Sequence, residues 1–482
     1  MSQPFMMIAT KKIAARAIAV CATGIFIYTS ALAAIPVQHW TQASGAQVFL
    51  VESSAIPMVD VQIDFDAGSR RDPPSQAGLA SMTAGMLDKG VRASERSAGL
   101  PQASSAPSGG GAAREAASVG GFEPALDENA LGEAWADLGA QFGAGASNDR
   151  MGFSLRSLTE PELLDKAVAL AARQIAEPSY PDAVWQRERQ RLQAALKESY
   201  TRPGNVIGRA YAQAVYGSHP YGYEMTEATL GRISVVDLRA AHDAGVVACR
   251  ARISMVGAVT RAQADAIAAR LLSRLPPLPC ASLPPLPVVA EVAPLSQPQE
   301  KRIPFDSAQA HVLIGQPGYK RSDPDHFALS VGNYILGGGG FVSRLTAEVR
   351  EKRGLVYGVS SSFSPGRHAG SFTVGLQTRP DQAGQAVALV RQVVKDFVTN
   401  GPTQAELQAA KDNLIGGFAL GLDSNRKLLN NLAGIAWNDL PLDYLDTWTQ
   451  QIEKVTVADV KAAFARKLQP EKMVTVILGS EQ

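Results

Sequence analysis

Histidine is the most direct source of metal chemistry in this chain, which has His39, His219, His242, His311, His326 and His368. A helix binds a metal through two histidines only when they lie three or four residues apart, because both side chains must leave the same face. The closest pair here, His311 and His326, is separated by fifteen positions. The spacing therefore excludes a helical two-histidine site, whereas a site assembled from distant histidines and carboxylates stays open.

A second group of chemically capable residues lies in the phrase EVREKRGLVYGV at residues 348–359, which follows a run of four glycines. The guanidinium of Arg350 can hold a peptide carbonyl or carboxylate with a fork of donors, and the hydroxyl of Tyr357 can help to stabilise an oxyanion. The plainer alternative is a solvated helix end carrying Arg350, Lys352 and Arg353, with Tyr357 packed beneath as a strand residue. The glycines are not a phosphate loop, because no Lys-Ser or Lys-Thr follows them.

An internal repeat indicates which elements must position these residues. Residues 232–242 match residues 454–464, and the short apolar strand at 253–257 matches 475–479, in both cases at an offset of 222. Both copies of the longer segment contain a capping box that starts an amphipathic helix. Each half reads as strands followed by helices and a closing strand. The sequence thus predicts an α+β fold of two homologous domains, each a sheet covered by helices.

The domain boundaries follow from length and composition. A chain of 482 residues is too long for one core. We expect an N-terminal domain at 36–274, a proline-rich linker at 275–300 and a C-terminal domain at 301–482. Proline at this density favours a semi-rigid polyproline II spacer, with a ligand for a proline-binding module as the alternative.

An insertion rich in Ser, Ala, Gly and Pro is expected at about 93–123. It has too little apolar content to pack, so we interpret it as a disordered surface loop. Its deletion should leave the melting temperature almost unchanged.

The N-terminus is typical of an exported protein. Lys11, Lys12 and Arg16 precede a largely apolar run at 17–34, and the small residues of Ala-Leu-Ala at 31–33 fit a signal-peptidase site. We expect a signal peptide at 1–33 and a periplasmic mature protein. The alternative is an uncleaved membrane anchor. Lipidation at Cys21 is disfavoured, because Val20 is bulkier than the residue that normally precedes a lipidated cysteine.

The mature chain gives few signals for other partners. No further segment approaches the length of apolar sequence that a membrane span requires, so we expect no membrane association after cleavage. The net charge of +1 provides no global field for nucleic acid. Cys249 and Cys280 remain after cleavage, and an oxidising compartment allows them either to pair or to stay as two thiols.

Two segments resemble a known family. DAGSRRDPP at 66–74, followed by GLASMTAGMLDKG at 78–90, resembles the entrance to the active site of the pitrilysin and insulinase-type zinc peptidases, the inverzincins. In that family the helix carries H-x-x-E-H, in which two histidines bind zinc and the glutamate activates its water. The matching positions here are Ser81, Ala84 and Gly85. The third family ligand is a glutamate on a later helix, seven residues after an acidic residue that matches Glu188, and its position here is Ala195. The resemblance thus implies a clam-shell half with no metal and no cofactor of its own.

The same resemblance assigns a role to the second half. In bacterial two-subunit members one polypeptide carries H-x-x-E-H, and the other carries an arginine and a tyrosine seven residues apart that bind substrate near the scissile carbonyl. Residue by residue, these are Arg350 and Tyr357. The HPYG sequence at 219–222 also resembles the family, and we expect His219 to fix a loop.

The resemblance implies a zinc-free subunit of a periplasmic heterodimeric metallopeptidase, inactive alone. It would act on unfolded peptides together with a homologous subunit that holds the zinc. The alternative is a non-catalytic periplasmic scaffold that binds peptides or acts as a chaperone. A hydrolase with Ser81 as the nucleophile lacks a histidine base nearby in the sequence.

The purified mature protein should contain no stoichiometric zinc and should cleave no peptide by itself, because Ser81, Gly85 and Ala195 replace every family ligand. Metal analysis after dialysis, with a peptide-cleavage assay on the same sample, measures both. One tightly bound zinc ion per chain would contradict this prediction.

Overall fold

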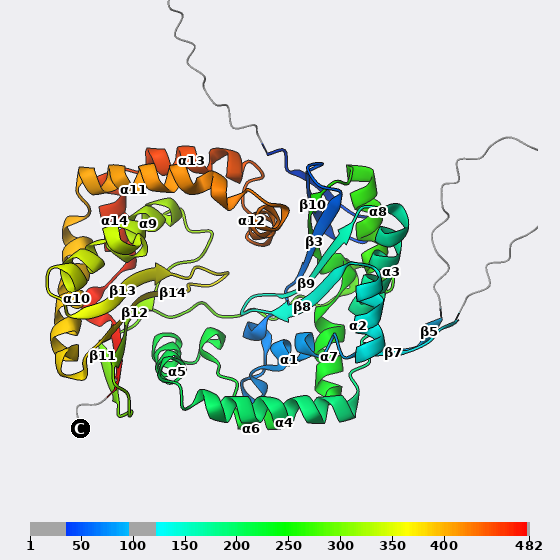
Figure 1. Cartoon of the computed structure of the whole chain (residues 1–482), viewed down its shortest axis with the longest axis horizontal. Helices are drawn as coiled ribbons and strands as arrows, with labels where there is room; N and C mark the ends of the chain where they lie inside the picture. Colours follow the sequence, from blue (N-terminus) through cyan, green and yellow to red (C-terminus); the bar gives the residue numbers. More distant parts are fainter. Residues whose placement is uncertain (1–34, 96–121, 480–482) are drawn as a thin grey trace, which may run out of the picture. The chain divides into compact units, whose positions relative to one another are not determined.

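The computed structural model of the chain describes residues 35–95 and 122–479 (Figure 1). The expected signal peptide at 1–33 and most of the expected insertion at 93–123 lie outside these residues. None of the helices in the described ranges combines the length and the apolar character that crossing a bilayer requires.

The first half of the chain builds a six-stranded sheet whose central strands are buried along most of their length. The closing strand β10 pairs in parallel with β2 and antiparallel with β3, so the last strand of this half lies in the middle of its sheet. In sheet order the strands are β1 (Gln38–Thr41), β2 (Gln47–Glu52), β10 (Arg252–Gly257), β3 (Met58–Phe65), β9 (Met151–Leu158) and β8 (Gln141–Ala146).

The second half builds a five-stranded sheet with the same topology. Its closing strand β15 again pairs in parallel with one neighbour, β11, and antiparallel with the other, β12. The two closing strands are the segments that match at the offset of 222, so the repeat and the α+β fold are confirmed. In sheet order the strands are β11 (Gln299–Ile303), β15 (Val474–Leu478), β12 (Ala310–Pro317), β14 (Ser371–Thr378) and β13 (Val356–Phe363).

The helices repeat as well. Both predicted capping boxes form: the side chain of Ser234 accepts from the backbone of Asp237, and that of Thr456 accepts from Asp459. The first half contains α1 (Leu79–Gly85), α2 (Glu128–Asp137), α3 (Pro161–Ala176), α4 (Asp182–Ser199), α5 (Pro203–Tyr216), α6 (Glu227–Gly231), α7 (Val235–Gly245) and α8 (Arg261–Leu272). The second half contains α9 (His326–Asn333), α10 (Ala383–Asn400), α11 (Gln404–Gly417), α12 (Asn425–Trp437), α13 (Tyr444–Lys454) and α14 (Val457–Lys467).

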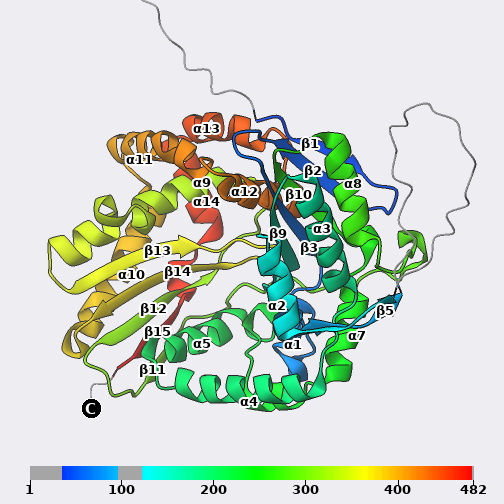
Figure 2. The same ribbon diagram turned by 45° about the vertical axis from the view of Figure 1, so that its right-hand side comes forward.

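Each sheet is covered on one face by helices of its own half and on the other by a helix of the other half (Figure 2). Helix α12 packs on β10 and β3, whereas α5 packs on β12 and β15. Side chains alternate between the two faces of a strand, so in β2 the residues Val48 and Leu50 join the core of their own half while Phe49 and Val51 meet α12. The halves therefore exchange α5 and α12, which begin 222 residues apart.

The two exchanged helices bury two small apolar clusters, and α5 also adds a hydrogen bond to the opposite half. The hydroxyl of Tyr211 on α5 donates to the backbone carbonyl of Phe372 at 2.9 Å. The first cluster joins Phe49, Val51 and Val256 to Leu429, Leu432 and Ala436. The second joins Ile207, Tyr211 and Val215 to Val474, Val476 and Leu478.

The linker is held against the first half up to Ala290, whereas Glu291 forms an ion pair with Lys320 of the second half. Cys249 and Cys280 form a disulfide, with their Cα atoms 5.7 Å apart, which decides the question that the sequence left open. Arg250 donates to the carbonyl of Pro284 and Arg71 to that of Pro287. The ring of His219 contacts the carbonyl of Ala290 at 3.0 Å. These contacts make the linker a fixed part of the structure.

The ends of the expected insertion belong to a small strand pair. Strand β5 (Ser94–Glu95) pairs with β6 (Phe122–Glu123), next to a pair formed by β4 (Gly90–Val91) and β7 (Leu126–Asp127). The mostly buried guanidinium of Arg274 forms ion pairs with Glu123 and with Glu177 at 2.9 Å. The expected insertion at 93–123 therefore includes Ser94 and Glu123, which belong to the strand pair and to its contacts.

Two deletions should differ in their effect on stability. Replacing residues 96–121 by an Asn-Gly turn leaves β5 and β6 joined, so the melting temperature should stay close to that of the full chain. Deleting 93–123 removes Ser94 and Glu123 from the surroundings of Arg274, so the melting temperature should fall. Thermal unfolding of both variants tests the difference, and equal melting temperatures would contradict the structural role of the strand pair.

Candidate functional site

The helix that matches the family's zinc helix is α1, and the segment before it is built to start that helix. Gly78 precedes α1 with a φ of 103°, a conformation that favours glycine. The carboxylate of Asp72 accepts hydrogen bonds from the backbone of Gly78 and of Ala80, each at 2.9 Å. Asp72 therefore satisfies two of the backbone donors that the start of a helix leaves open.

The former zinc positions carry no group that binds a metal. Ser81 is partly buried, Ala84 is buried and Gly85 is exposed with open space around it. Ala195 is exposed on α4, where Glu188 forms an ion pair with Arg191 at 2.8 Å. Within residues 35–95 and 122–479, no cluster of three or more His, Cys, Asp or Glu residues could hold a metal ion.

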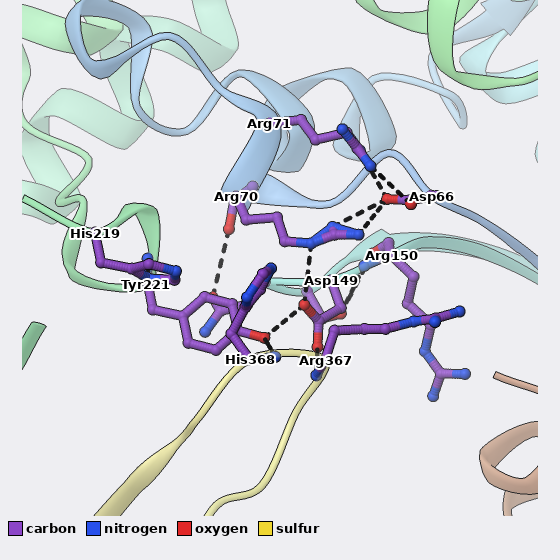
Figure 3. A network of polar contacts seen from close by, with 12 residues as sticks. Asp66, Arg70, Arg71, Asp149, Arg150, His219, Tyr221, Arg367 and His368 are labelled. Carbon is purple, nitrogen blue, oxygen red and sulfur yellow. Dashed lines mark hydrogen bonds and ion pairs between the residues drawn. The ribbon is translucent and has the colours of Figure 1, made fainter. Parts of the chain in front are cut away.

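The DAGSRRDPP segment instead forms a network of charged contacts (Figure 3). Arg70 and Arg71 both donate to the carboxylate of Asp66. Burial opposes the ionisation of Asp66, but the hydrogen bonds and charges of the two arginines hold its pKa below the usual value. These contacts hold residues 66–71 in one conformation just before α1.

Asp149 connects this network to the second half. Its carboxylate accepts from the hydroxyl of Tyr221 at 2.6 Å and from the backbone N–H of Arg367 at 3.0 Å, and it lies 3.3 Å from Nε of Arg70. Arg367 lies on the connection between β13 and β14. The segment that resembles an active-site entrance is here a junction between the halves.

A pocket of about 500 Å³ lies beside this junction. Its walls come from the DAGSRRDPP segment, from α1 through Leu79 and Ala80, from α7 and from the linker at 286–290. Ser81 and Gly85 do not line it. The pocket is therefore separate from the former zinc positions.

Tyr357 lies at an irregularity in the edge strand β13. Val356 pairs with Thr378 and Gly358 pairs with the adjacent Gln377, so Tyr357 is the extra residue of a β-bulge. Bulges redirect a side chain out of the regular pleat. The side chain of Tyr357 is 81% exposed, so the alternative in which it packs beneath the strand is wrong.

Arg350 lies beside Tyr357, on the π-helical turn η8 (Thr346–Glu351). Its guanidinium carbon is 5.7 Å from the centre of the Tyr357 ring and 4.8 Å from that of Phe341, which is itself 69% exposed. The structure thus brings together the two residues that the sequence singled out and adds Phe341. An isolated phenylalanine after four glycines has no spacing that marks it as functional.

The three cations of the REKR sequence have different surroundings. Lys352 and Arg353 form ion pairs with Glu348 at 2.6 and 2.8 Å, and their hydrogen bonds lower its pKa. Arg350 has no ion pair among the residues that the structure describes. Its guanidinium therefore lies beside two exposed aromatic rings without a carboxylate partner, which suits binding of an oxygen-bearing group.

The comparisons with known proteins identify the family. Residues 232–414 match the family model described as the peptidase M16 inactive domain. The crystal structure of a peptidase M16 inactive domain from Pseudomonas fluorescens is 34% identical, with 92% of this chain and 98% of that chain covered and a TM-score of 0.81. This chain belongs to the peptidase M16 family. The resemblance to the pitrilysin and insulinase-type peptidases is therefore confirmed.

Two further M16 relatives differ in how much they cover. The non-peptidase homolog YmxG of Helicobacter pylori is 25% identical over 91% of this chain and 92% of its own length. An uncharacterized zinc protease of Streptomyces coelicolor is 36% identical over 156 residues, which are 32% of this chain and 33% of that protein. The match to the zinc protease thus spans about a third of its length.

The cap of α1 should make stability depend on pH. Burial raises the pKa of Asp72 from 3.8 to about 6, against the hydrogen bonds from Ala80 and Gly78. The folded state holds this proton more tightly than the unfolded chain does. The contribution of Asp72 to the free energy of unfolding is therefore fully present below about pH 4 and is lost as the pH rises through about 6.

Asp72→Asn removes this titration, so its free energy of unfolding should fall less than that of the wild type between about pH 4 and about pH 7. Urea unfolding at the two pH values measures the difference. The control Asp137→Asn changes an exposed carboxylate on α2 and should keep the wild-type dependence. An unchanged dependence in Asp72→Asn would contradict the assignment.

Proposed function

We propose that this chain is the zinc-free subunit of a periplasmic heterodimeric metallopeptidase. In this proposal Arg350 and Tyr357 complete a site whose zinc lies on a homologous partner, and the substrate is an unfolded peptide. The observation that carries the proposal is the pair itself: an exposed tyrosine on a bulge beside a partly buried arginine that has no ion pair with any described residue.

The two residues have complementary chemistry. The guanidinium of Arg350 offers a fork of donors to a peptide carbonyl or carboxylate, and the rings of Phe341 and Tyr357 limit its orientations. The hydroxyl of Tyr357 can donate a hydrogen bond to an oxygen that gains negative charge during peptide hydrolysis. Zinc, when bound by the partner, would supply the activated water.

The first half of this chain explains why a partner is needed. The positions of the family ligands hold Ser81, Gly85 and Ala195, none of which supplies a metal donor of the family type. The disulfide between Cys249 and Cys280 fits an oxidising compartment and supports export. The expected signal peptide is consistent with the same compartment.

The test is complementation with a zinc-bearing M16 partner. Tyr357→Phe removes only the hydroxyl, and Arg350→Ala removes the fork. Each should lower turnover of an unstructured peptide by the mixed complex, on the order of 10²-fold for a lost oxyanion donor, while the complex still forms. Peptide cleavage and size-exclusion chromatography of the same mixtures measure activity and assembly.

Two matched variants control for the loss of a positive charge and for the loss of a tyrosine hydroxyl elsewhere in the chain. Lys352→Ala removes a neighbouring cation that pairs with Glu348, and Tyr200→Phe removes a hydroxyl from α4's C-terminal end. Both should leave turnover unchanged. Full activity of Arg350→Ala and Tyr357→Phe would remove the support for complementation, and weaker peptide binding without any change in rate would favour the scaffold function.

A further inference from the structure

A second pocket, of about 400 Å³, lies where the first half, the linker and the second half meet. The first half contributes the segment from Cys249 to Arg252, and the linker contributes Pro285 and Leu286. The second half contributes Arg367 and Trp437. Three of its lining residues are arginines, so its chemistry differs from that of the larger, mostly apolar pocket.

The arginines of this pocket exceed the carboxylates that could neutralise them. Arg252 and Arg367 both pair with one carboxylate, that of Asp439. Arg250 donates to the carbonyl of Pro284, which carries no charge. Asp66 also lines the pocket, but it is already shared by Arg70 and Arg71. The pocket therefore carries an excess of positive charge.

Two buried N–H donors belong to residues that line the pocket. Trp437 is 5% exposed, and its indole Nε1 has no hydrogen-bond partner in the described part of the chain. Nε of Arg367 is likewise buried without a partner there. Both nitrogen atoms lie below the accessible surface, so they do not contact a ligand in the pocket. The charge of the three arginines therefore indicates the ligand chemistry.

The arrangement holds the arginines in place. The guanidinium carbons of Arg367 and Arg252 lie 5.1 and 5.9 Å from the centre of the Trp437 ring. Stacking on an indole fixes the plane of a guanidinium, and a fixed fork binds phosphate or carboxylate oxygens more strongly than a mobile one. The side chains of Arg252 and Arg367 are 24% and 32% exposed, so an anion can reach them from solvent.

We propose that this pocket binds a small oxyanion, either a free phosphate or the terminal carboxylate of a peptide, through Arg250, Arg252 and Arg367. The anion would contact residues from both halves of the chain and would stabilise their junction. This site is distinct from Arg350 and Tyr357, so it does not depend on the proposed peptidase function.

The test uses the purified full chain in a chloride buffer. Titration calorimetry measures binding of inorganic phosphate, of a short peptide with a free C-terminal carboxylate, and of the same peptide with an amidated C-terminus. We expect saturable binding of phosphate or of the free-carboxylate peptide, but not of the amidated peptide, and a raised melting temperature that sodium chloride of equal ionic strength does not produce. The two arms distinguish a free anion from a peptide terminus.

Three variants locate the site. Arg250→Gln should weaken binding about tenfold, the effect of losing one charge-assisted hydrogen bond. Trp437→Phe replaces the indole beside Arg252 and Arg367 with a weaker cation–π partner, so it should also weaken binding. Arg187→Gln changes a 61%-exposed arginine outside the pocket and should bind like the wild type.

The proposal is overturned if neither inorganic phosphate nor the peptide with a free C-terminal carboxylate binds to the chain. It is also overturned if Arg250→Gln binds as tightly as the wild type. Should Trp437→Phe fail to fold, Arg250→Gln decides alone, because Arg250 is only partly buried and its guanidinium contacts a linker carbonyl.

Discussion

Each sheet of this protein has an apolar face that its own half does not cover. Strand β2 alternates Val48 and Leu50 toward one face with Phe49 and Val51 toward the other, and only the first pair meets helices of the same half. Helix α12 covers the second face, and α5 does the same for the other sheet. Burial contributes about 1.5–3 kcal/mol for each large aliphatic or aromatic side chain, so separating the halves would expose a costly surface. The exchange of α5 and α12 holds the two halves together. The linker, the disulfide and the charged junction all lie between or beside halves that are placed in this way.

The junction explains what the DAGSRRDPP segment does without zinc chemistry. Asp72 starts α1, Asp66 binds two arginines, and Arg70 reaches Asp149, which in turn accepts from Tyr221 and from the backbone of the second half. Removing one member of such a largely buried charge network typically costs about 3–5 kcal/mol, because the remaining charge loses its partner. The segment is therefore needed for the fold, whereas the metal positions on α1 carry side chains that only pack or face open space.

The candidate site is confined to the second half and has a different physical basis. Arg350 lies partly buried on a π-helical turn, whereas Tyr357 on the bulged edge strand and Phe341 after the glycines are exposed. Exposed aromatic and cationic groups contribute little to the stability of the chain that carries them, but they are the groups that a peptide or a partner protein can bind.

The sequence alone determined the repeat, the α+β fold, the family and the absence of the family's zinc ligands, because these depend on local spacing: capping boxes, apolar strands and single positions within a motif. It also placed Arg350 and Tyr357 seven residues apart, but it could not decide whether Tyr357 is buried. Only the tertiary structure decided that, through the bulge opposite Thr378 and Gln377. The pairing of Cys249 with Cys280, the exchange of α5 and α12, and the pocket that brings Arg250, Arg252 and Arg367 together also required it. These features join residues from distant parts of the chain, and no local pattern in the sequence records which distant segment will cover a given face.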